Sequence, residues 1–231
     1  MHLFSAGPAV RPPAELFIGR FVIPKEPKIK RVYAFFDGQG LFHSALEAFG
    51  YGYPNFDPKL LAEKISDNQG WILGKVYFYT GIPDMKDNPF WHSFWSAKLA
   101  IMGTRGIATF SRPLRYQEDS VTLPDGNIIR FRVGREKGID VRIALDIVRT
   151  ARQNLYDVAL VFSQDQDLSE VADEIRAIAK LQDRWIKIAS AFPYSPTLKN
   201  KRGINSTDWI KIDKVTYDAC IDPHDYRPKK I

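Results

Sequence analysis

The sequence is poor in the residues that build disulfide frameworks and zinc sites. Cys220 is the single cysteine among 231 residues, and there are only four histidines. One cysteine excludes an intrachain disulfide framework and any zinc site built from several cysteines. Because disulfides are rare in reducing compartments, such low cysteine use favours a cytoplasmic protein.

Long hydrophobic runs are also missing. No stretch approaches the roughly 18 consecutive apolar residues of a membrane-spanning helix. Residues 16–23 form the best apolar run near the start, but this run is short, begins late and contains Arg20, so it is a poor signal peptide. No membrane partner is therefore expected. Five of the 15 prolines lie in residues 1–30 without a period, which is typical of a tail or a loosely packed arm.

The composition of the rest is that of a folded chain. Hydrophobic residues make up 45% and aromatic residues 13%, enough for a substantial core. Lysine and arginine number 33 against 27 aspartates and glutamates, which gives a net charge of +6. This balance favours a polyanionic partner, although the total says nothing about where the charge lies.

Apolar runs typical of buried strands alternate with helical patterns along residues 31–192. Strands are predicted at 32–36, 73–79, 107–110, 157–162 and 185–189, with helices at 40–49, 58–68, from Asn88 onward, 139–151 and 168–181. This alternation predicts a three-layer α/β/α fold with a mainly parallel central sheet. A polar, basic segment at about 112–133 reads as an inserted β-hairpin turning at residues 124–127. Residues 193–231 are expected to be a basic extension packed on the domain.

Acidic residues stand at the ends of predicted strands. Asp37 ends the first strand, while Asp165 and Asp167 follow the strand at 157–162. Asp140 opens the preceding helix, and it joins them if that helix starts at the same edge. Ligands of such sheets bind outside the carboxyl ends of the strands. Carboxylates gathered there would repel one another unless they held a hard divalent cation such as Mg²⁺ or Mn²⁺. Such a metal can activate water and stabilise charge on a phosphodiester.

Helix capping is the alternative explanation for each acid taken singly. Aspartate is a common N-cap, and Asp167 with Glu170 has the spacing of a capping box. Asp140 in a first helical turn would complement the helix dipole. The shared edge of all four acids is harder to explain by capping. Asp146 does not share a helix face with Asp140, so it is interpreted as a structural or supporting carboxylate.

Basic residues concentrate in two segments, around the predicted hairpin and after residue 198. Phosphate contacts need such groups near the acids; Lys137 is the best placed, because it adjoins the Asp140 turn, and Arg135 is a further candidate. Solvated surface charge is the ordinary alternative for any single arginine. The aromatic run at 90–95 could stack on unpaired bases, but one apolar face of a helix is more often core.

The acidic motifs together resemble the NYN domain, a LabA-like branch of the PIN-like nuclease superfamily. The resemblance covers about residues 30–192 and rests on the order and spacing of Asp37-Gly38, Lys137-Gly138-Ile139-Asp140 with Asp146, and Ser163-Gln164-Asp165-Gln166-Asp167. It implies a parallel sheet between helices and cleavage of RNA with Mg²⁺ or Mn²⁺. The implied catalytic and metal-binding residues are Asp37, Asp140, Asp165 and Asp167. Substrate contacts are expected from Gln39, Lys137, Ser163 and Arg135, with Asp146 behind the ligands.

The first motif departs from the family pattern. The family usually reads Asp-Gly-x-Asn, whereas this chain has Gly40 in the last position and offers no side-chain amide there.

Two hypotheses about function follow: a metal-dependent endoribonuclease, or an RNA-binding or regulatory module with a weak or inactive site. A phosphatase of the haloacid dehalogenase type is a third, because Asp165 and Asp167 after a strand are similar to its nucleophile motif. Ser169 replaces the usual threonine or valine of that motif. The sequence is also compatible with a homo-oligomer.

Overall fold

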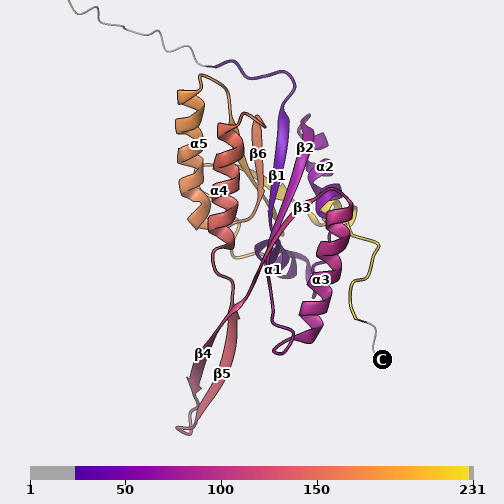
Figure 1. Ribbon diagram of the computed structural model, residues 1–231, viewed down its shortest axis with the longest axis vertical. Helices are drawn as coiled ribbons and strands as arrows, with labels where there is room; N and C mark the ends of the chain where they lie inside the picture. Colours follow the sequence, from indigo (N-terminus) through magenta and orange to yellow (C-terminus); the bar gives the residue numbers. More distant parts are fainter. Residues whose placement is uncertain (1–23, 229–231) are drawn as a thin grey trace, which may run out of the picture.

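Six parallel strands form the central sheet of the protein. The structure, a computed structural model, describes residues 24–228, so most of the predicted N-terminal tail lies outside the described residues. The strand order is β3-β2-β1-β6-β7-β8 (Figure 1). The strands of this sheet are β1 (Arg31–Asp37), β2 (Ile72–Ile82), β3 (Ala108–Pro113), β6 (Val158–Phe162), β7 (Lys187–Pro193) and β8 (Asp208–Ile212).

Strand β1 shows why its sequence is a continuous apolar run. Val32, Ala34 and Phe36 are fully buried in the cluster on one face of the sheet, and Phe35 is fully buried on the other. Strand β6 is buried at every position. A parallel strand covered on both faces needs apolar side chains throughout, which is the pattern that predicted both strands.

Helices cover both faces of the sheet. One face packs against α1 (Gly38–Phe49), α2 (Pro58–Asn68) and α3 (Pro89–Thr104). The other packs against α4 (Ile139–Arg152) and α5 (Ser169–Leu181) (Figure 1). The predicted three-layer α/β/α architecture is therefore confirmed. A one-turn 3-10 helix, η1 (Gln166–Leu168), precedes α5, whereas the sequence predicted one helix from residue 168.

The predicted aromatic helix is α3, and its apolar face is mostly core. Asn88 caps this helix by accepting from the Trp91 amide. Phe94 and Trp95 are buried, as the core interpretation expected, while Phe90 stays exposed. Lys98 is also fully buried, which the apolar pattern did not predict.

The predicted hairpin is present and extends away from the sheet (Figure 1). Strands β4 (Arg115–Thr122) and β5 (Ile128–Arg135) pair with each other in antiparallel register. Gly126 in the connecting turn has a φ of 86°, a conformation that glycine adopts without strain. The hairpin begins later than the predicted residue 112, because β3 continues its pairing with β2 as far as Pro113.

The C-terminal segment contributes elements that the sequence did not predict. Strand β8 pairs with β7 at one edge of the sheet, and the short helix α6 (Lys214–Asp218) follows it. Most side chains of β8 are exposed, so the strand lacks the apolar run that marked β1 and β6. No helix within residues 24–228 is long and apolar enough to span a bilayer.

An acidic cleft at the carboxyl edge of the sheet

A cleft of about 300 Å³ opens at the carboxyl ends of the central strands. Asp37 is the last residue of β1, Asp165 follows β6, and Asp140 lies in the first turn of α4. The structure thus brings together three of the four predicted catalytic acids. The residues that line the cleft are Asp37, Glu136, Lys137, Gly138, Ile139, Asp140 and Asp165.

Asp37 is held by two donors from the protein. It is the N-cap of α1, and its carboxylate accepts from the Gly40 amide at 2.9 Å. The Ser163 hydroxyl donates to its other oxygen at 3.1 Å. Burial raises the pKa of Asp37, and the nearby Asp165 charge acts in the same direction, while the two donors oppose the rise. Asp37 therefore caps α1 and belongs to the acidic cluster at the same time.

Ser163 links two of the acids. Its buried hydroxyl donates to Asp37 and accepts from the Asp165 backbone amide at 3.1 Å. This chain of hydrogen bonds fixes the end of β1 relative to the turn after β6. Ser163 was predicted to contact substrate; in the structure its hydroxyl contacts Asp37 and the Asp165 amide, and it is not among the residues that line the cleft.

Glu136 is a fourth carboxylate that the sequence analysis missed. It follows β5, lines the cleft and accepts a hydrogen bond from the Gly81 amide at the end of β2. Burial and the Asp37 charge raise the pKa of Glu136 to about 7. Its signal in the sequence is faint, since it sits in a basic segment after a hairpin rather than after a strand of the sheet.

The remaining predicted residues lie at varied distances from the cleft. Lys137 lines it and is exposed, and the Gln39 amide donates to the Gly81 carbonyl at 3.3 Å. Arg135 sits on the hairpin and pairs with Asp119 at 3.6 Å. Asp167 is exposed and is not among the residues that line the cleft, because the η1 turn carries it outward.

Asp146 is buried and does not line the cleft; it lies on the side of α4 that packs toward β2. Its carboxylate accepts from the Tyr79 hydroxyl at 3.0 Å and pairs with Arg142 at 2.8 Å and Arg149 at 2.7 Å. The residue therefore organises side chains of α4 and β2 rather than lining the cleft.

The chemistry of the cleft suits a hard cation. Its donors are carboxylate oxygens, the ligands that Mg²⁺ and Mn²⁺ prefer, and its rim carries one cationic side chain, Lys137. Within the described part of the chain, no three acidic, histidine or cysteine side chains lie close enough to hold a metal ion in their present positions. The carboxylates of Asp37 and Glu136 are turned to donors of the protein instead.

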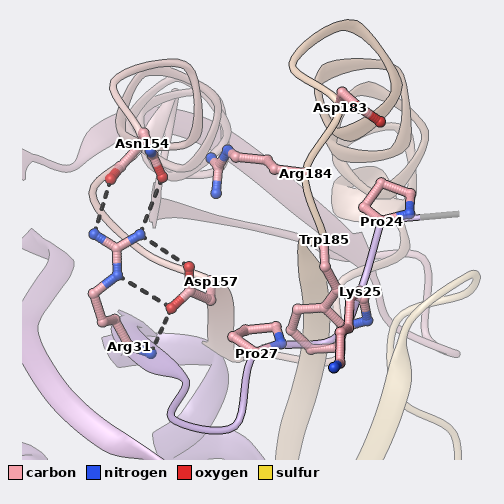
Figure 2. Close-up of a pocket in the computed structure, with 9 residues that line it drawn as sticks. All are labelled: Pro24, Lys25, Pro27, Arg31, Asn154, Asp157, Asp183, Arg184 and Trp185. Carbon is pink, nitrogen blue, oxygen red and sulfur yellow. Dashed lines mark hydrogen bonds and ion pairs between the residues drawn. The ribbon is translucent and has the colours of Figure 1, made fainter. Parts of the chain in front are cut away.

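A second cleft, of about 470 Å³, lies at the opposite end of the strands. Figure 2 shows the Arg31 side chain bound to Asp157 and Asn154 there. Arg184 donates to the backbone carbonyls of Ala151 and Tyr156. These guanidinium groups donate to carbonyls of the last turn of α4 and of the segment after it, and to the Asp157 carboxylate, so they stabilise the chain where α4 ends.

Comparisons with known proteins match most of the chain to one family. The sequence profile of the NYN domain matches residues 31–182. A crystal structure of a protein of unknown function from Vibrio parahaemolyticus is 19% identical, with a TM-score of 0.49, covering 80% of this chain and 94% of that one. Ribokinase from Giardia lamblia is 9% identical, with a TM-score of 0.33, covering 74% and 50%. Neither likeness is close enough to support a function. No curated protein is significantly similar in sequence.

Proposed function

Since the chain belongs to the NYN domain family, a family of PIN-like nucleases, we propose that it is a metal-dependent endoribonuclease. The observation that supports this most strongly is the meeting of Asp37, Glu136, Asp140 and Asp165 in one cleft. That cleft lies where ligands bind in open α/β sheets, outside the carboxyl ends of the strands. The proposed reaction is hydrolysis of RNA phosphodiester bonds.

Mg²⁺ or Mn²⁺ is the proposed cofactor, which Asp37, Asp140 and Asp165 would hold, with Glu136 beside them, after side-chain rotations that bring their oxygens closer together. A bound divalent cation supplies charge stabilisation for the phosphoryl oxygens and lowers the pKa of bound water. It also offsets the repulsion among carboxylates that share a small cleft.

The residues of the chain have distinct tasks in this proposal. Ser163 fixes the Asp37 carboxylate relative to the Asp165 turn, and the Gly81 amide orients Glu136. Lys137 stands at the rim, where its ammonium group would bind the phosphate backbone. Asp146 acts from outside the cleft by holding the side chains that α4 presents.

The test is cleavage of mixed-sequence RNA by the purified protein in a titration of Mg²⁺ or Mn²⁺. Cleavage should require the metal and stop with a chelator. Asp140→Asn and Asp165→Asn should each lower the rate by at least about a hundredfold, since each removes a charged group from the reacting centre. Asp167→Asn is the matched control, because Asp167 belongs to the same turn as Asp165 but lies outside the cleft. If the two cleft variants cut as fast as the parent, the assigned site is wrong.

An RNA-binding module without cleavage is the second candidate, and Gly40 favours it. This position has no side chain, and a carboxylate oxygen of Asp37 occupies the space that a Cβ atom would take. The module would bind RNA with a strong salt dependence and would not cut it in any metal. Hydrolysis of a generic phosphomonoester, measured in parallel, would instead revive the phosphatase alternative.

A further inference from the structure

Two arginines lie over one aromatic ring beside the acidic cleft. The guanidinium carbon of Arg112 is 5.4 Å from the centre of the Phe110 ring, and that of Arg142 is 4.9 Å from it. Arg112 and Phe110 come from β3, and Arg142 comes from the second turn of α4. We call Phe110, Arg112 and Arg142 the arginine stack. Guanidinium groups on an aromatic face are held by cation–π attraction and keep their edges free for hydrogen bonds.

The arginine stack reaches the wall of the cleft through Gly138. Gly138 lines the cleft, and a Cβ atom built on it would lie 2.7 Å from a terminal nitrogen of Arg112. Only the backbone of this glycine therefore separates the Arg112 guanidinium from the acidic cleft. Gly138 has no side chain to block the way, so a polymer that leaves the cleft over Gly138 would meet the Arg112 guanidinium.

Arg142 is fixed in place from below. Its Nε–H donates to the buried Asp146 carboxylate at 2.8 Å, and the Tyr79 hydroxyl holds the same carboxylate oxygen at 3.0 Å. Within residues 24–228 its two terminal amino groups have no protein acceptor, so they remain available to a ligand. A guanidinium that is already ordered loses less conformational entropy when it binds.

Arg112 carries a positive charge that no acid neutralises. It is exposed, and no carboxylate of the described chain forms an ion pair with it. Arg132 and Arg135 on the neighbouring hairpin differ, because they pair with Asp87 and Asp119. Among the described residues, Arg112 is thus an unpaired cation next to Gly138 in the cleft wall, and the unpaired Lys137 lines the same cleft.

We propose that the arginine stack is a phosphate-binding subsite for an RNA strand that runs out of the acidic cleft over Gly138. This inference rests on the proposed ribonuclease function and adds to it the place where the substrate backbone is gripped. Arginine suits the task, since its planar fork of N–H groups matches phosphate oxygens in bidentate geometry. Such contacts position a strand without reading its sequence, so the subsite predicts little base preference.

The experiment measures binding separately from cleavage. A short fluorescein-labelled single-stranded RNA of mixed sequence is titrated with the full chain in a chelator, and fluorescence anisotropy gives the dissociation constant over about 50–200 mM salt. Arg112→Gln and Arg142→Gln should each weaken binding about 5- to 30-fold and reduce the slope of log K against log salt by about one.

Arg149→Gln is the matched control. Arg149 shares the Asp146 carboxylate with Arg142 from the same helix, but it is not part of the arginine stack. Either substitution leaves Asp146 one guanidinium and the Tyr79 hydroxyl, so the two variants should unfold at similar temperatures. The control should bind RNA within about twofold of the parent, in line with the small effect of a cation away from the phosphate path.

Cleavage with Mn²⁺, measured on the same variants, keeps this inference distinct from the proposed function. If the parent binds RNA without cutting it and the two stack variants bind weakly, the subsite stands and the nuclease proposal fails. If the parent cuts and the stack variants bind as the control does, the subsite is wrong and the nuclease proposal survives. Equal losses in all three variants would mean a general effect of charge and would overturn the subsite, as would a parent that binds no RNA.

Discussion

Gly40 stands where the resemblance to the NYN domain led us to expect asparagine, and its surroundings show what the glycine does. Its backbone amide donates to the carboxylate of Asp37, the N-cap of α1, at 2.9 Å, and an Asp37 oxygen fills the position of the absent Cβ atom. A side chain at position 40 therefore requires the Asp37 carboxylate to turn. The glycine at position 40 therefore has two effects: it removes the side-chain amide of an asparagine, and it leaves room for the present orientation of Asp37.

Substitution of Gly40 separates these two effects. Gly40→Ala adds the Cβ atom without an amide, so it should displace Asp37 and lower metal-dependent cleavage about tenfold or more, an effect of about 1.4 kcal/mol on the barrier. Gly40→Asn adds the same Cβ atom and an amide, so its rate relative to the alanine variant reports on the amide alone. We expect the asparagine variant to cut faster than the alanine variant. An alanine variant with unchanged cleavage would show that the orientation of Asp37 does not matter.

The candidate site could be predicted where strand ends determine it. Asp37 and Asp165 follow buried strands of a parallel sheet, so their common edge follows from topology. Glu136 could not be found this way, because it reaches the cleft through a long-range hydrogen bond with Gly81 after the hairpin returns. Asp167 was expected beside Asp165, but a 3-10 turn separates the two side chains.

The β4–β5 hairpin is the element with the weakest connection to the core. It contacts the loop after β2 through the Tyr116 hydroxyl, which accepts from the Asp84 amide at 3.0 Å, and through the Arg132–Asp87 pair. Several of its apolar side chains are exposed, among them Ile128 at 61%. Its base nevertheless sets the position of Glu136, so the hairpin is connected to the cleft more closely than to the core.

Replacing residues 116–134 by a short glycine-serine linker tests whether the hairpin matters for the cleft and not for the stability of the core. The core is untouched, so the free energy of unfolding in urea should change by no more than about 1 kcal/mol. Cleavage should fall, because Glu136 follows β5 directly and would no longer be positioned to accept from the Gly81 amide. Shortening only the tip around residues 123–127 is the control and should leave the rate unchanged. A large loss of stability in the linker variant would show that the hairpin supports the sheet.

The elements of the fold were predictable to different degrees for a related reason. Strands β1 and β6 are buried on both faces and carry an unbroken apolar signal. Strand β8 is recognised only by its pairing with β7, since Asp208, Trp209 and Lys211 of this strand are exposed. Sequence patterns record burial, whereas the place of an exposed edge strand depends on contacts that no local pattern contains.

At the scale of the whole molecule, a buried lysine ties the C-terminal segment to the body. The Lys98 amine donates to the Phe56 carbonyl at 2.9 Å and lies 3.5 Å from an Asp222 oxygen. The ring centre of Tyr226 is 4.7 Å from it. Burial lowers the pKa of Lys98 to about 8, although the Asp222 charge opposes the change. Helix α3 and the residues after α6 are thus joined through one ammonium group.

This lysine predicts a pH dependence of stability. Between about pH 8 and pH 10.5 the unfolded chain keeps the Lys98 proton while the folded chain has released it. Because the unfolded state then binds more protons, the contribution of Lys98 to the free energy of unfolding rises with pH across this window, by a few kcal/mol at most. Urea unfolding of the parent and of Lys98→Met at several pH values isolates this group. The stability of the parent relative to the variant should increase with pH, and a constant or falling difference would contradict the assignment.

The hairpin also has a consequence for the protein in concentrated solution. Strands β4 and β5 pair with each other, which leaves the outer backbone edge of each strand without a partner in the described sheets. Open edges invite strand addition between molecules, and charged side chains are a common defence against it. Arg130 and Arg132 on β5, with Glu118 on β4, serve as such gatekeepers. We therefore expect the charge of the hairpin to keep neighbouring copies from joining edge to edge, and a variant that removes this charge to gain a tendency to aggregate.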